Sequence, residues 1–152
     1  MCARLELNGT VLALRNPVPV WLEEGRSAWL PWTGFARQES LARWLGMGAQ
    51  LVDVPVRRFA ERSTRTHRVI WESIPLGMVV RGLVDSNSGK PLLKILTRAA
   101  TGEEFAKYEH PRMPVVEAPR VSAEWILPPA PVTDRTVLVQ PELFLTPRIA
   151  HG

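Results

Sequence analysis

Cysteine is nearly absent from this chain, which has one in 152 residues, at position 2. A lone cysteine excludes a disulfide within the chain. The sequence also lacks the CxxC and HExxH spacings of metal sites, a glycine-rich loop that would hold phosphates, and the GxSxG turn of serine hydrolases. We therefore expect neither a metal nor another cofactor.

Long apolar runs are missing as well. No stretch approaches the roughly 20 residues that a membrane span needs. The first residues do not follow the basic-then-apolar order of a signal peptide. Together with the scarcity of cysteine, these absences favour a reducing, intracellular setting. We expect a cytoplasmic monomer with no membrane partner.

Proline and glycine, by contrast, are frequent, with 14 and 10 residues, and they argue against long helices. The Asn8–Gly9 pair predicts a tight hairpin between two short strands. Residues 39–48 and 101–110 predict short helices, the second capped by Thr101. The remaining apolar or alternating runs are typical of strands, at 3–7, 10–14, 18–22, 49–56, 67–74, 77–85 and 91–99. The sequence therefore predicts an α+β fold that is mostly antiparallel β.

Arginines are concentrated in one segment of a chain whose net charge is +4. Residues 57–68 contain Arg57, Arg58, Arg62, Arg65 and Arg68. A guanidinium group donates paired hydrogen bonds to phosphate, so the cluster favours contact with nucleic acid. A solvated face that serves solubility has the same pattern, and the sequence leaves both interpretations open.

The position of the lone cysteine gives it an uncommon chemistry. If Met1 is removed, Cys2 begins the chain and carries a free α-amine and a thiol two carbons apart. These two nucleophiles can attack the same carbon atom, which an internal cysteine cannot do. Taken alone, a cysteine at position 2 can also be incidental.

Several stretches, in order, resemble the motifs of the SOS-response-associated peptidase (SRAP) family. "MCAR" resembles the family's Met-Cys-Gly-Arg start, and "EHPRMPVV" is similar to its His-x-Arg-Met-Pro motif. Weaker matches lie between and after them, in "RNPVPVW", "AWLPW", "FARQES", "FAER", "KILTRAAT" and "SAEWILPPA". The resemblance covers residues 1–130, which we expect to form one SRAP-like, barrel-like domain. We expect residues 131–152, which are proline-rich, to be irregular.

The resemblance implies a protein that recognises abasic sites in single-stranded DNA and links to them covalently through Cys2. It places Glu61 and His110 at the family's catalytic positions, where they would move protons and help the sugar ring to open. Strand cleavage as an abasic-site lyase, self-removal of Met1 and association with the nucleoid of a bacterial or phage host are further implications. The predicted DNA contacts are Arg4, Arg37, Arg57, Arg58, Arg62, Thr97 and Arg112. Without the resemblance, Glu61 would be a surface carboxylate, His110 a structural histidine, and Arg112 a helix cap or a partner of Glu109.

The chain departs from the family at three positions of these motifs. Phe35 replaces an asparagine that holds the N-terminal amine, Ala60 replaces a tyrosine, and Arg62 replaces the aromatic residue after the glutamate. Phenylalanine has no group that could replace the amide's hydrogen bonds. Two other functions therefore stay open: a DNA-binding relative without chemistry, and a peptidase that depends on Cys2.

Tryptophan is frequent, with six residues, most of which we expect in the core: Trp21, Trp29, Trp32, Trp44, Trp71 and Trp125. Trp32, and with it Trp29, could instead offer a ring on which an unpaired base stacks.

Overall fold

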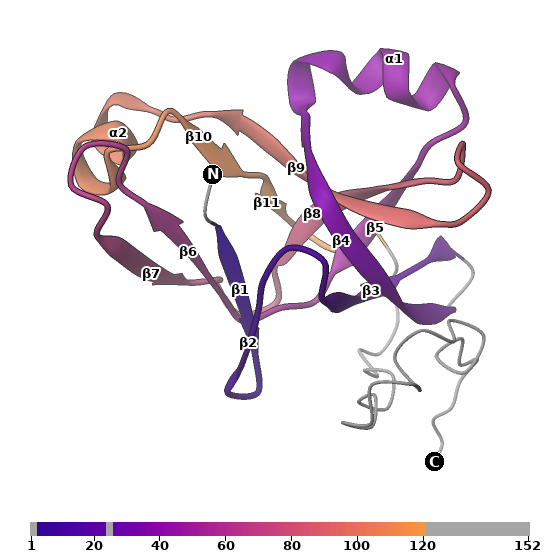
Figure 1. Ribbon diagram of the computed structural model, residues 1–152, viewed down its shortest axis with the longest axis horizontal. Helices are drawn as coiled ribbons and strands as arrows, with labels where there is room; N and C mark the ends of the chain where they lie inside the picture. Colours follow the sequence, from indigo (N-terminus) through magenta and orange to yellow (C-terminus); the bar gives the residue numbers. More distant parts are fainter. Residues whose placement is uncertain (1–2, 24–25, 121–152) are drawn as a thin grey trace.

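The structure is a computed structural model that describes residues 3–23 and 26–120. Cys2, Trp125 and the segment 131–152 lie outside the described residues. Figure 1 shows two sheets with short helices at their margins. No helix in the described ranges is long and apolar enough to cross a membrane.

The smaller sheet has four antiparallel strands in the order β2-β1-β6-β7. Its strands are β1 (Arg4–Leu7), β2 (Thr10–Leu12), β6 (Arg58–Arg62) and β7 (Val69–Ser73). Asn8 and Gly9 join β1 to β2 with φ angles of 52° and 83°. Positive φ at both central positions is the geometry of the tight hairpin turn that the sequence predicted.

The larger sheet has seven strands in the order β10-β9-β4-β3-β5-β8-β11. Their bounds are β3 (Pro17–Trp21), β4 (Ser27–Arg37), β5 (Gln50–Val54), β8 (Val79–Asp85), β9 (Leu92–Ala99), β10 (Arg112–Pro114) and β11 (Val116–Glu117). Strand β8 also pairs with β9, so β9, β4, β3, β5 and β8 form a closed ring of pairings. Only the β4–β9 pair is parallel among the pairings that these described strands make.

The helices are short and lie at strand ends. A 3-10 turn (Gln38–Ser40) leads into α1 (Leu41–Gly46), and α2 (Gly102–Tyr108) follows β9. Thr101 caps α2 in a reciprocal capping box with Glu104, which confirms the predicted start of this helix. The α+β class with mostly antiparallel strands is confirmed.

Four strands were not predicted from the sequence, namely β4, β6, β10 and β11. Strand β4 contains Pro31 and Gly34, residues that usually argue against a strand, and Pro31 pairs with Pro17 across the ladder. Strand β6 lies inside the arginine-rich segment, where the many charged residues obscure the alternation of apolar and polar residues that usually identifies a strand. Phe59, Ala60 and Glu61 are all buried, between the exposed Arg58 and the half-buried Arg62, so burial alone does not show the alternation that the strand geometry gives.

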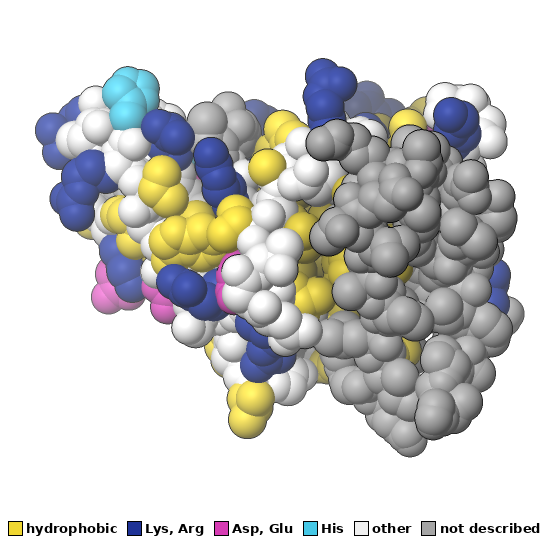
Figure 2. Space-filling model, turned by 60° about the horizontal axis from the view of Figure 1, so that its bottom comes forward, with side chains coloured by type: hydrophobic (Ala, Val, Ile, Leu, Met, Phe, Trp, Pro, Cys, Tyr) yellow, Lys and Arg dark blue, Asp and Glu magenta, His cyan; other side chains and the backbone are white. Residues whose placement is uncertain are grey.

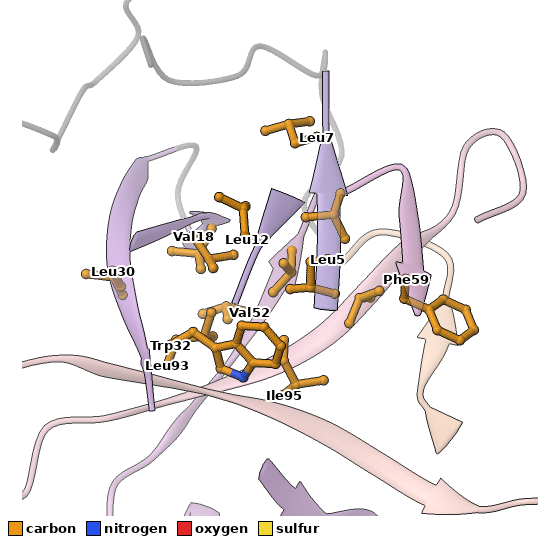
Figure 3. Close-up of a cluster of buried hydrophobic side chains, with 14 of the residues drawn as sticks. Leu5, Leu7, Leu12, Val18, Leu30, Trp32, Val52, Phe59, Leu93 and Ile95 are labelled. Carbon is orange, nitrogen blue, oxygen red and sulfur yellow. The ribbon is translucent and has the colours of Figure 1, made fainter. Parts of the chain in front are cut away.

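The main core joins the two sheets. Figure 3 shows Leu5, Leu12 and Phe59 of the smaller sheet together with Trp32 and Ile95 of the larger one. Trp32 is 0% exposed and donates its indole N–H to the Gly34 carbonyl oxygen at 3.0 Å. The prediction that Trp32 stacks on a base is therefore wrong, because neither ring face reaches solvent. Trp29 is also buried, as the core interpretation predicted.

Gly82 offers a test of how tightly side chains pack inside the closed ring of strands. A Cβ atom there would lie 2.9 Å from Leu93 Cδ1 and 3.3 Å from the Lys94 carbonyl oxygen, and Leu93 is fully buried. We expect Gly82→Ala to lower the free energy of unfolding by about 1–3 kcal/mol in chemical denaturation. Gly46→Ala is the matched control, since open space surrounds that helical position and alanine favours helix. Equal stabilities of the two variants would contradict the tight packing at Gly82.

Candidate functional site

Glu61 and His110, which are 49 positions apart in the sequence, face each other in the structure. The Nε2 atom of His110 lies 3.8 Å from Oε1 of Glu61. Both residues are buried, at 3% and 4% exposure. The structure thus brings together the two described residues that were predicted to be catalytic.

Glu61 is held in an environment that disfavours its charge. It follows Phe59 on the inner side of β6, and its Oε1 atom is buried without a hydrogen-bond partner. Burial raises the pKa of this carboxyl from 4.5 to about 8. Most of the Glu61 carboxyl is therefore protonated at pH 7, so it can donate a proton as well as accept one.

The backbone of Arg112 orients His110. The Arg112 amide N–H points to Nδ1 at 3.1 Å, and the Arg112 carbonyl oxygen lies 2.8 Å from the same nitrogen. Nδ1 accepts from the amide in one tautomer of the imidazole and donates to the carbonyl in the other. Both arrangements direct Nε2 toward Glu61, with a proton on Nε2 in the first and a lone pair in the second.

A clamp around Glu109 fixes the distance between the two residues. Glu109 ends α2 with a left-handed backbone, φ 53°, and its carbonyl oxygen accepts from the amide and the hydroxyl of Thr64, each at 3.0 Å. Its carboxylate accepts from the hydroxyl of Ser63 at 2.5 Å and pairs with Arg65. These contacts attach the turn after β6, which follows Glu61 by two residues, to the segment that carries His110. Figure 1 shows α2 beside this turn.

Arg112 makes its contacts away from Glu109. Its guanidinium donates two hydrogen bonds of 2.8 Å to Glu39 and one of 2.9 Å to the Thr97 carbonyl oxygen. The hydrogen bonds from Arg112 lower the pKa of the Glu39 carboxyl to about 2. The suggested Arg112–Glu109 pair is therefore wrong, and Arg112 instead joins β10 to β9 and to the turn after β4.

Thr97 was predicted to contact DNA, but it is 5% exposed and its hydroxyl lies 3.3 Å from Arg112 Nε. This burial contradicts a direct contact, and the side chain serves to hold Arg112. Arg37, its neighbour in the β4–β9 ladder, is exposed.

The predicted arginine contacts separate into groups. Arg4, Arg58 and Arg62 share the outer face of the smaller sheet, because their registers place them on the side opposite Glu61. Arg57 precedes β6 and is half-buried, and Arg65 is bound in the Glu109 clamp.

Sequence reasoning missed Trp71, which was assigned to the core. It is half-exposed on the same outer face, with the Arg58 guanidinium carbon 4.8 Å from its ring centre.

Cys2 lies outside the described residues, but its neighbour in the chain is described. Arg4 pairs with Ala60 in the antiparallel β1–β6 ladder. Ala3 precedes Arg4 and Glu61 follows Ala60, so Ala3 and Glu61 lie on the same side of that pair.

Comparisons with known proteins found no relative. No protein-family model, curated protein or solved structure matches this chain. Within the described ranges, no three histidine, cysteine, aspartate or glutamate side chains are grouped as a metal site would require.

The buried carboxyl predicts an unusual dependence of stability on pH. Because the folded pKa of Glu61 is raised, the unfolded chain loses a proton that the folded protein retains as pH rises from about 4.5 to about 8. The free energy of unfolding therefore falls across this range. We expect Glu61→Gln to raise it by about 2–4 kcal/mol at pH 8 and to change it little near pH 4.5, as measured by urea denaturation. The exposed Glu103→Gln is the control. A gain of equal size at both pH values would exclude ionisation of Glu61 as the cause.

Proposed function

We propose that this protein recognises abasic sites in single-stranded DNA and links to them covalently through Cys2, as its resemblance to SRAP proteins implies. The observation that carries the proposal is the buried Glu61–His110 pair with its 3.8 Å separation. The pair lies where β1 and β6 meet, and the chain that enters β1 comes from Cys2. The chemistry of an N-terminal aminothiol needs a pair of groups that transfer protons.

The reaction joins two nucleophiles to one carbon. The open sugar of an abasic site presents an aldehyde, and the α-amine of Cys2 attacks its carbonyl carbon. Loss of water from the adduct leaves a Schiff base. The thiol sulfur then adds to the same carbon, and its proton passes to the nitrogen as the five-membered thiazolidine ring closes. Overall, a C–N and a C–S bond replace the C=O bond, and one water is released. The second step is intramolecular, which gives it a large advantage in effective concentration.

Glu61 and His110 have complementary roles in this scheme. The protonated carboxyl of Glu61 donates a proton to the hydroxyl that departs as water, and the resulting carboxylate accepts the proton that the nitrogen loses as the Schiff base forms. Nε2 of His110 faces Oε1 and assists ring opening by exchanging protons with the sugar oxygen. The clamp around Glu109 keeps both groups in place, so they do not have to reorganise during the reaction.

A DNA-binding protein without chemistry is the second candidate. It is favoured by Phe35, which is partly buried and packs edge-on against Trp32 of the core with ring centroids 5.7 Å apart. A side chain used in this way cannot hold an amine. A peptidase that depends on Cys2 is the third candidate, and the next experiment distinguishes all three.

Purified protein should form a heat-stable, denaturant-resistant band with an abasic single-stranded oligonucleotide. The band should vanish in Cys2→Ser, because the oxygen analogue lacks the thiolate chemistry needed for ring closure. Intact mass measurement should first confirm that Met1 is absent. Salt-sensitive binding without a band would support the second candidate. Proteolysis that requires Cys2 and ignores DNA would support the third.

Glu61→Gln should slow crosslinking at pH 7 by about 10²–10⁴-fold, the usual range for a positioned proton donor, while affinity for the same DNA stays nearly unchanged. The ratio of wild-type to variant rates should fall as pH rises through about 8, since the wild-type carboxyl then loses its proton. Glu103→Gln should crosslink like wild type. A collapse of DNA affinity in Glu61→Gln would show that the residue has a binding role instead.

A further inference from the structure

The smaller sheet presents a cationic outer face on the side opposite Glu61. Cross-strand register places Arg4, Ala60 and Trp71 in one row, and Arg58 and Arg62 two residues away on either side of Ala60. We call Arg4, Arg58, Arg62 and Trp71 the outer arginine face. Figure 2 shows Lys and Arg side chains gathered around an apolar band on one side of the molecule.

The arginines of this face have no carboxylate partner among the described residues that would neutralise their charge. Within the described ranges, Arg4, Arg58 and Arg62 form no ion pair with a carboxylate, whereas Arg65, Arg98 and Arg112 each do. Glu6 is the acidic residue on the same face, opposite Arg58 in the ladder, and its carboxylate accepts from the Gly9 amide at 2.6 Å. Three cations against one acid leave the face positive.

Arg58 and Trp71 form a stacked pair on this face. The guanidinium carbon lies 4.8 Å from the centre of the Trp71 ring, and Arg58 itself is exposed. The ring limits the orientations that the guanidinium can adopt, so its planar group is held at the surface. A planar cation of this kind is a surface on which nucleic-acid bases stack.

We propose that the outer arginine face binds the backbone and one unpaired base of single-stranded DNA. Arg4 and Arg62 contact phosphates, while the base stacks on the Arg58–Trp71 pair. Charge complementarity favours a polyanion, and an aromatic residue among the cations favours exposed bases over a duplex, whose bases are already stacked. The choice of DNA rests on the proposed function, but the contact itself does not require Cys2, Glu61 or His110.

The face also lies close to the candidate site along the chain. Ala60 and Arg62 flank Glu61 on β6 and point to the opposite side of the sheet.

The test uses the full-length protein and an undamaged, fluorescently labelled oligo-dT, which cannot crosslink. We expect Trp71→Ala to weaken binding by about tenfold in fluorescence anisotropy, with Trp71→Phe retaining most of the affinity. Trp44→Ala is the matched control, since Trp44 is also half-buried with a cation over its ring, Lys94 Nζ at 5.9 Å, but belongs to α1. Arg58→Ala should weaken binding and reduce the salt slope by about one, whereas Arg58→Lys should restore the slope and leave the affinity low.

Thermal melts of each variant check that it is folded, and Trp71→Phe keeps the proposal testable if Trp71→Ala does not fold. Wild-type affinity in both Trp71 variants, equal affinity for a duplex of the same length, or no binding of oligo-dT by the wild type would each overturn the inference. If the protein forms no crosslink but Trp71→Ala loses binding to oligo-dT, the inference about the outer arginine face holds while the proposed function fails. Crosslinking together with oligo-dT binding that does not depend on Trp71 would support the proposed function and overturn the inference about the outer arginine face.

Discussion

The alternation of side chains along β6 is the constraint on which both faces of the smaller sheet depend. A strand directs successive residues to opposite sides, so Phe59 and Glu61 lie on one side of β6 and Ala60 and Arg62 on the other. Pairing with β1 on one edge and β7 on the other fixes this register. A slip of one residue would turn Glu61 to the outer side of the sheet and Arg62 to the inner side, and it would separate Glu61 from His110.

Burial of Glu61 has opposite effects on stability and on chemistry. A buried carboxyl with one oxygen, Oε1, unpaired costs free energy as it ionises, and the protein limits this cost by keeping the proton up to about pH 8. The same retained proton makes the group a donor at neutral pH. Glu109 and Ser63 keep this environment in place, since their hydrogen bond connects the turn after β6 to the segment before β10. Local stability at the clamp supports a site that is itself unfavourable.

Much of the candidate site could be predicted from short motifs. The resemblance selected Glu61 and His110, and the basic segment selected Arg58 and Arg62. The contacts between them could not be predicted, because they depend on where a turn and a helix end meet. Trp71 shows the limit most clearly. An aromatic residue in an apolar run suggests core, and its half-exposed position is decided by which side of β7 faces solvent.

The sequence by itself determined the class of fold, since frequent proline and glycine with short alternating runs allow little except short strands and short helices. It also determined the hairpin at Asn8 and Gly9 and the cap at Thr101, where local hydrogen bonds and φ angles suffice. The tertiary structure alone decided that β4 continues through Pro31, that Trp32 is buried and that Arg112 binds Glu39. These features depend on contacts between distant segments, and the free energy of such contacts is not encoded in any short stretch of the chain.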